Sequence, residues 1–197
     1  MRLLIVGLLL TSGYVHAQSG LILGRPAYGG TGCPAGTASV TLSPDHDAIS
    51  ILFDQFVTEA GSTTGRRVDR KSCNLSVPVK VPQGYSVSVF KTDYRGYNLV
   101  PESGAYNRLD TEYFWAGVRG PRFRKIYSGP INENYTQSNG IIVNAIVWTP
   151  CGASVTLRVN SSIMSQSNPQ MDETMMTVDS ADISSGFIYH IQWRRCG

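Results

Sequence analysis

The sequence predicts an all-β protein that folds as a single antiparallel β-sandwich. Three observations support this prediction. Apolar residues occur in short runs with a period of two, as in strands that bury one face. Glycine, proline, asparagine and aspartate separate these runs and favour turns. The chain has no convincing helical period, so we expect eight or nine short strands.

Residues 1–17 have the order of a secretory signal peptide. Arg2 precedes the apolar run 3–10, and Ala17 is the small residue that suits cleavage. The run is too short to cross a bilayer core of roughly 30 Å, so we expect a secreted, extracellular protein without membrane insertion. Residues 18–36 follow as a segment rich in glycine and proline, and residues 37–197 form the predicted sandwich domain.

The composition agrees with an extracellular protein. Charged residues make up 16% of the chain, and the formal net charge of +3 at pH 7 falls by one when Arg2 leaves with the signal peptide. A protein so close to neutrality has no general attraction for nucleic acid. Roughly 180 mature residues suffice for one core, so we expect one domain and a monomer.

Four cysteines, at positions 33, 73, 151 and 196, predict two disulfides. Three pairings are possible. Each half of the chain holds two cysteines, which favours Cys33–Cys73 and Cys151–Cys196. On the chain-entropy model each bond contributes about 4 kcal/mol to stability. The cysteines lack the CxxC spacing and the clustered histidines of a zinc site, so we expect no metal and no cofactor.

The first half of the chain contains four alternating apolar runs. They span residues 38–42, 49–53, 75–81 and 85–89. Pro82-Gln83-Gly84 separates the last two runs and suits a turn, because proline is favoured at its second position and glycine at its fourth. We therefore expect the runs on either side of this turn to pair as a β-hairpin.

The second half is less regular. Further strands are expected at 113–117, 155–159 and 187–193, and a central strand at 141–148, where both faces are apolar. Residues 120–139 are broken by two prolines and give no clear strand, and residues 161–182 suggest a mobile loop or a poorly packed hairpin. This pattern suits a jelly-roll-like or immunoglobulin-like sandwich.

Three sequons make the chain a candidate glycoprotein: Asn74-Leu75-Ser76, Asn134-Tyr135-Thr136 and Asn160-Ser161-Ser162. Strand alternation places Asn74 and Asn160 on outward faces. Asn134 is expected in a loop. All three can accept a glycan on steric grounds, and the alternative is that they occur by chance and remain bare.

Four segments carry a resemblance to a known family: GCPAGTASVTLSPD, RKSCNLSVPVKVPQGYSVSVFKTDYRGY, WTPCG and YHIQWRRC. They resemble domain of unknown function 4360, a family of exported proteins in fungi and bacteria. The match runs from about Gly32 to Cys196 and includes all four cysteines. The resemblance implies a secreted, cysteine-paired domain, and it supplies no catalytic residue or ligand.

One segment stands out as a candidate binding site. Residues 91–97, KTDYRGY, place two aromatic rings, two cations and a carboxylate within seven positions. Stacking on aromatic rings combined with hydrogen bonding is how lectins hold sugars. The residues that we predict to bind are Lys91, Asp93, Tyr94, Arg95 and Tyr97. The alternative is structural, with Asp93 paired to Arg95 and both tyrosines covering the edge of the core.

These features favour a binding module for a cell-surface or wall component, with a carbohydrate or surface-protein ligand. A secreted hydrolase with an acidic site is the second hypothesis, and a structural wall or matrix protein is the third. The carboxylates available for hydrolysis are Asp93, Asp110, Glu112, Asp172 and Glu173. Enzymatic activity is left open, although His190 on an exposed strand face is a poor candidate for a general base. His46 lies between Asp45 and Asp47, where a metal site is conceivable but simple turn chemistry is favoured.

Overall fold

The computed structural model describes residues 20–102, 104–178 and 186–197, so the predicted signal peptide at 1–17 lies outside the described residues. These residues form thirteen strands and one 3₁₀ turn. The elements are β1 (Ile22–Leu23), β2 (Ala27–Gly29), β3 (Ala38–Leu42), β4 (Ala48–Phe53), β5 (Val57–Ala60), β6 (Val68–Lys80), β7 (Tyr85–Val100), β8 (Tyr106–Trp115), β9 (Arg122–Ser128), β10 (Ile131–Gly140), η1 (Val143–Ala145), β11 (Ser154–Gln166), β12 (Thr174–Thr177) and β13 (Phe187–Arg195).

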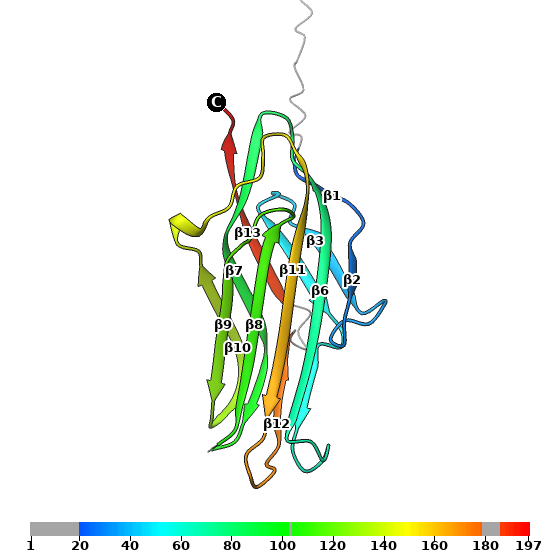
Figure 1. Cartoon of the computed structure of the whole chain (residues 1–197), viewed down its shortest axis with the longest axis vertical. Coiled ribbons are helices and arrows are strands. Elements are labelled where there is room, and N and C mark those ends of the chain that lie inside the picture. Colours follow the sequence, from blue (N-terminus) through cyan, green and yellow to red (C-terminus); the bar gives the residue numbers. More distant parts are fainter. Residues whose placement is uncertain (1–19, 103, 179–185) are drawn as a thin grey trace, which may run out of the picture.

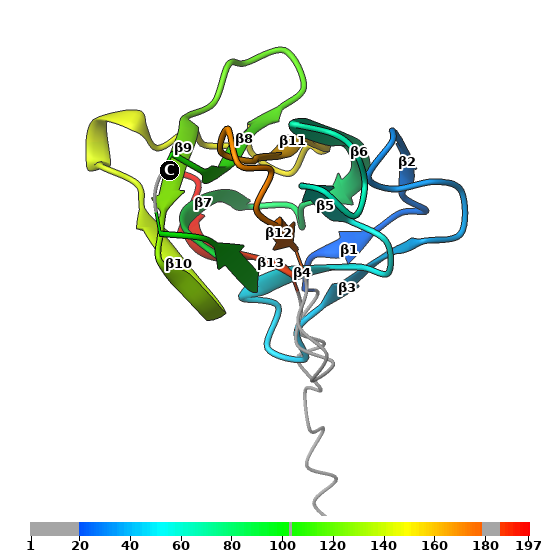
Figure 2. The same cartoon turned by 90° about the horizontal axis from the view of Figure 1, so that it is seen from below.

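The strands form two antiparallel sheets that pack face to face, as predicted. Sheet A has the order β1-β6-β11-β8-β9, with β2 also paired to β6. Sheet B has the order β3-β4-β13-β7-β12-β5, with β10 paired to the other edge of β7. Figure 1 shows sheet A in front, and the end-on view in Figure 2 separates the two layers.

The eight main strands follow the jelly-roll order. If they are labelled B to I along the chain, sheet B reads B-I-D-G through β4, β13, β7 and β10, and sheet A reads C-H-E-F through β6, β11, β8 and β9. Each of these adjacent pairs is antiparallel. This order distinguishes the protein from the immunoglobulin-like alternative and is the double-sheet arrangement that shields most strand edges.

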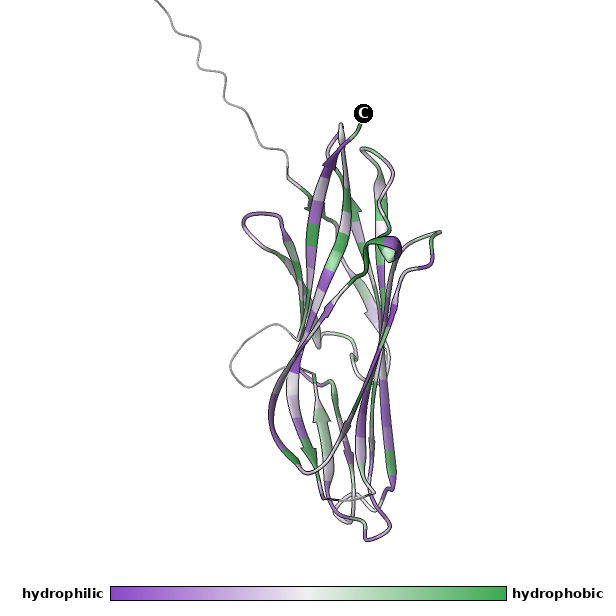
Figure 3. Cartoon of the chain, turned by 90° about the vertical axis from the view of Figure 1, so that its left-hand side faces the viewer, coloured by the Kyte–Doolittle hydropathy of each residue, from purple (hydrophilic) through white to green (hydrophobic). Residues whose placement is uncertain are grey.

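The core lies between the sheets because alternate residues of each strand point inward. Ile49, Ile51 and Phe53 on β4 are at most 2% exposed, as their alternation predicts. Phe53 contacts the rings of Phe56 and Phe187 with centroid distances of 5.1 and 5.2 Å. The hydropathy colouring in Figure 3 follows the same alternation along the strands.

The predicted hairpin at 75–89 is wrong. Its two strands and its turn exist, and the turn closes through a hydrogen bond from the Tyr85 amide to the Pro82 carbonyl. However, β6 pairs with β11 in sheet A, whereas β7 pairs with β13 in sheet B. The turn therefore carries the chain from one sheet to the other, as a jelly roll requires.

Three expectations for the second half are also corrected. Residues 141–148 form no central strand, because η1 projects from the sandwich with Ile142 and Val143 74% and 83% exposed. Residues 120–139 form β9 and β10, which lie in opposite sheets on either side of Gly129-Pro130. The predicted loop at 161–182 contains the end of β11 and all of β12 within the residues that the structure describes.

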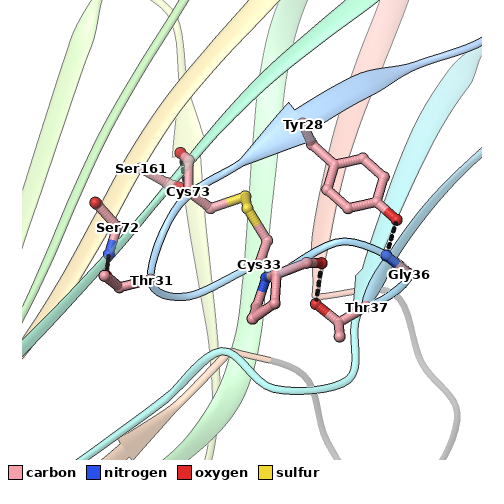
Figure 4. The surroundings of a disulfide bond; sticks show 9 residues. Tyr28, Thr31, Cys33, Gly36, Thr37, Ser72, Cys73 and Ser161 are labelled. Carbon is pink, nitrogen blue, oxygen red and sulfur yellow. Dashed lines mark hydrogen bonds between the residues drawn. A yellow bond between two sulfur atoms is a disulfide. The ribbon is translucent and has the colours of Figure 1, made fainter.

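Both predicted disulfides form. Cys33–Cys73 ties the loop before β3 to the inner face of β6, and both sulfurs are buried in the core. Around this bond, Thr31 accepts a hydrogen bond from the Ser72 amide, and Ser161 donates to the Cys73 carbonyl (Figure 4). Cys151–Cys196 instead joins the chain before β11 to the chain after β13, and Cys151 is exposed.

We predict that a mild thiol reductant opens Cys151–Cys196 before Cys33–Cys73, because a thiolate must reach the sulfur that it attacks. Brief reduction, alkylation and peptide mass spectrometry should find label on Cys151 and Cys196 at reductant doses that leave the core pair intact. Equal labelling of all four cysteines while the protein remains folded by circular dichroism would contradict the prediction.

Candidate functional site

The predicted binding segment lies on β7, directly after a β-bulge. Ile191 of β13 pairs with Val89, and the preceding His190 pairs with Lys91, so Phe90 is an extra residue on β7. A bulge of this kind reverses the alternation of every residue that follows it. The extra residue Phe90 therefore determines which of the predicted site residues point into the core and which point to the outer face.

Tyr94 points into the core and is fully buried. Its ring stacks on Phe123 of β9 with 5.1 Å between centroids and meets Phe187 edge-on at 5.0 Å. Its hydroxyl accepts hydrogen bonds from Thr92 at 3.0 Å and from Thr111 at 2.8 Å. Burial raises the pKa of Tyr94, so the phenol stays neutral. Tyr94 is a core residue, and we withdraw it from the binding site.

Asp93 lies on the outer face of sheet B and joins three strands. Its carboxylate is 2.7 Å from Nε2 of His190, 3.1 Å from Nζ of Lys91 and accepts a hydrogen bond from Ser138 at 2.5 Å. Burial acts to raise the pKa of Asp93, but the hydrogen bonds from Ser138, His190 and Lys91 together lower it below its ordinary value. The cluster therefore ties β10 and β13 to β7 through a carboxylate.

Arg95 and Tyr97 follow on the same outer face. Both are half-buried. The Arg95 amide donates to the Gly186 carbonyl, and the Tyr97 hydroxyl donates to Oδ1 of Asn132 on β10 at 2.6 Å. The structure thus places four of the five predicted residues on one face of sheet B, where they contact neighbouring strands: Lys91, Asp93, Arg95 and Tyr97.

The outer face of sheet A carries a groove of about 570 Å³ that the sequence did not reveal. Strand register sets its residues in rows across the sheet. One row is Ser72, Ser162, Asp110 and Arg124, and the next includes Asn160, Glu112 and Arg122. Serines are short, so on β6 and β11 they form a low floor beside the longer side chains of β8 and β9.

The two carboxylates of the groove are both paired with arginine. Asp110 is in contact with Arg124 and with Nε of Arg108, the latter at 2.7 Å. Glu112 pairs with Nε of Arg122 at 3.1 Å. The side chains of Arg122 and Arg124 are more than 60% exposed, so their cations also face solvent.

A fourth arginine stands on the opposite wall of the groove. Arg70 of β6 donates from Nη2 to Oγ of Ser162 at 3.3 Å, a hydroxyl rather than a carboxylate. The groove lining holds four arginines against one aspartate and one glutamate. Its positive charges therefore exceed its negative charges by two.

The chain matches one known protein family over nearly its whole length. The family model described as Domain of unknown function (DUF4360) matches residues 22–196, nearly the whole chain. The chain belongs to this family. An "Uncharacterized secreted protein" of Arthroderma benhamiae is 33% identical over 169 residues, which cover 86% of this chain and 69% of the fungal protein. This DUF4360 protein is secreted, as its sequence predicts.

A solved structure of TmCBM61 in complex with beta-1,4-galactotriose also matches. The match covers 87% of this DUF4360 chain and 88% of that chain, with 11% identity and a TM-score of 0.30. With a TM-score this low, neither the topology nor the ligand of that protein can be assigned to this chain. The jelly-roll assignment of the DUF4360 chain rests on its own strand order.

The other candidate residues, Asp172, Glu173 and His46, do not line the groove. Asp172 and Glu173 belong to the segment between β11 and β12, where Glu173 accepts hydrogen bonds from Ser62 and Thr63. His46 occupies its turn with a positive φ and contacts the Leu21 carbonyl. Among the described residues, no group of three histidine, cysteine, aspartate or glutamate side chains could hold a metal ion. No described helix is long and apolar enough to cross a membrane.

Tyr94 and Tyr97 should respond differently to truncation. Tyr94→Ala empties a core site shared by both sheets and should cost about 4 kcal/mol of unfolding free energy. Tyr97→Ala, its matched control on the outer face, should cost about 1 kcal/mol. Urea denaturation followed by tryptophan fluorescence measures both values. Equal losses for the two variants would show that Tyr97 is also part of the core.

Asp93→Asn should destabilise the protein at neutral pH but not in acid. A carboxylate whose pKa is lowered by folding stabilises the native state above its unfolded pKa of about 3.9, and that stability disappears as the pH falls through the folded value. We expect a loss of about 2 kcal/mol at pH 7 that disappears in acid, once the pH has fallen below the lowered folded pKa of Asp93. Urea denaturation across this range, with the exposed Asp45→Asn as control, tests this. A loss that persists unchanged in acid would contradict it.

Proposed function

We propose that this protein is a secreted binding module for an acidic polysaccharide of a cell surface or wall, and that the groove on sheet A is its site. The observation that carries the proposal is the arrangement of the groove, in which a floor of serine and asparagine lies between arginine-bearing walls. Its volume of about 570 Å³ suits a few sugar rings, since ligand pockets measure roughly 300–1,000 Å³.

The lining favours a ligand rich in hydroxyl groups. Ser72, Ser162 and Asn160 present short polar side chains that can donate and accept hydrogen bonds. Asp110 and Glu112 add carboxylate acceptors beside them. Sugars carry many hydroxyls in several directions, so a floor with both donors and acceptors matches them.

The charge of the groove favours an acidic ligand. A guanidinium group can hold a carboxylate through two parallel hydrogen bonds, which is the geometry that uronic acids offer. Arg70 engages a hydroxyl, and Arg124 shares Asp110 with Arg108, so neither is the sole partner of a carboxylate. These two cations can bind a ligand anion without leaving a protein carboxylate unpaired.

The same geometry favours binding over hydrolysis. A glycosidase needs one carboxyl group that can donate a proton, whereas Asp110 and Glu112 are both held by arginine. On sheet B, the Ser138 hydroxyl donates to Asp93 and not to an imidazole, so it is not set up as a nucleophile activated by His190. We therefore rank a binding module above a secreted hydrolase.

In protein produced without N-glycans, replacing Arg70 and Arg124 together by alanine should weaken binding to polygalacturonate about tenfold or more, because two charge-assisted contacts are lost. Affinity electrophoresis or calorimetry at low and physiological salt measures this, and binding should weaken as salt rises. Arg195→Ala, an exposed arginine at the end of β13 on the other sheet, is the matched control and should bind normally.

Three results would overturn the proposal. The first is equal binding of the double variant and the parent protein to polygalacturonate. The second is equal binding of the parent protein to polygalacturonate and to an uncharged polysaccharide. The third is release of reducing sugar by the parent protein and its loss in Asp110→Asn, which would identify a hydrolase.

A further inference from the structure

The three sequons occupy different positions relative to the groove. Asn160 lies on β11, the central strand of sheet A, and lines the groove. Asn74 lies directly opposite it on β6, in the same row. Asn134 is exposed on β10 of sheet B, on the other side of the sandwich. The structure corrects the predicted loop position of Asn134, and it places a glycan acceptor inside the proposed binding site.

A glycan on Asn160 would begin among side chains of the groove. The side chain is half-buried, and its neighbours across the strands are Asn74 on one side and Glu112 on the other. Below it is the inner face of the sheet, where Val159 and Ser161 are buried against the core. The first sugars attached to Asn160 therefore start inside the groove.

We propose that Asn160 is an N-glycosylation site whose glycan occupies the groove and blocks the polymer from it. The proposal deepens the proposed function and rests on it. The donor is an oligosaccharide on a polyprenyl diphosphate. A bond forms between Asn160 Nδ2 and the first sugar carbon, the bond from that carbon to the diphosphate breaks, and the amide loses a proton. Transfer takes place on the extended chain, before β11 pairs with its neighbours.

Tethering explains why the glycan prevails over a free polymer. A covalently attached chain has an effective concentration in the millimolar range or higher at a site that it can reach. Its hydroxyls meet the same serines and arginines that the polymer would use. A free polymer would have to displace a glycan that stays covalently attached beside the groove. A glycan on Asn134 cannot compete in this way, because the whole sandwich separates it from the groove.

The first test needs no polymer. The full chain is secreted from a glycosylating yeast, and glycopeptide mass spectrometry measures occupancy at Asn160 and Asn134. Peptide-N-glycosidase is then applied to the native protein. The Asn134 glycan should be released about tenfold or more faster than the Asn160 glycan, and the two rates should become equal after denaturation. Asn134 is exposed on an edge strand and Asn160 is half-buried on a central strand, so slow release at Asn160 counts for the proposal only together with the binding comparison that follows.

The second test compares polygalacturonate binding by Asn160→Gln and Asn134→Gln produced in the same yeast. Removing the Asn160 glycan should restore binding by about tenfold or more, whereas removing the Asn134 glycan should change nothing. An unoccupied Asn160 beside an occupied Asn134 would overturn the proposal, as would equal release rates in the native protein. Undiminished binding by protein glycosylated at Asn160 would overturn it as well. Slow release at Asn160 with no polymer binding by any variant would overturn the proposed function alone.

Discussion

The fold depends on one buried phenol that both sheets share. Tyr94 extends from β7 in sheet B and accepts a hydrogen bond from Thr111 of sheet A, while its ring packs on Phe123 of the same opposite sheet. A buried hydroxyl that lost these partners would cost free energy, so the inward direction of Tyr94 is strongly favoured. The alternation of β7 after Phe90 follows from this constraint and turns Asp93 to the outer face of sheet B, where its neighbours bury it.

The inner faces of both sheets form the core, and the two outer faces carry different features. On sheet B, β10 and β13 close around Asp93, and its hydrogen bonds tie strands together. On sheet A, the register sets Ser72 beside Ser162 in the middle of the sheet and leaves the long side chains on β8 and β9. A hollow with charged walls results from the order of short and long residues across four strands.

The sequence could predict what depends on neighbouring residues. Alternation located Ile49, Ile51 and Phe53 in the core, and cysteine spacing indicated both disulfides. It could not predict what depends on pairing between distant strands. The hairpin prediction was therefore wrong, and the β-bulge at Phe90, which reverses the inward and outward alternation of β7, was not predicted. The groove was hidden for the same reason, because its floor and walls come from four strands between residues 70 and 162. The candidate carboxylates Asp110 and Glu112 were the one available signal.

The position of β9 gives its arginines a second consequence. β9 is the last strand of sheet A, and such an edge can recruit a strand from another molecule. Arg122 and Arg124 place cations on the outer side of this edge and Lys125 places one on its other side, so two copies that approach edge to edge repel each other. A polyanion that neutralised these cations would remove the repulsion. The charge that suits an acidic ligand therefore also helps to keep this sheet edge unpaired.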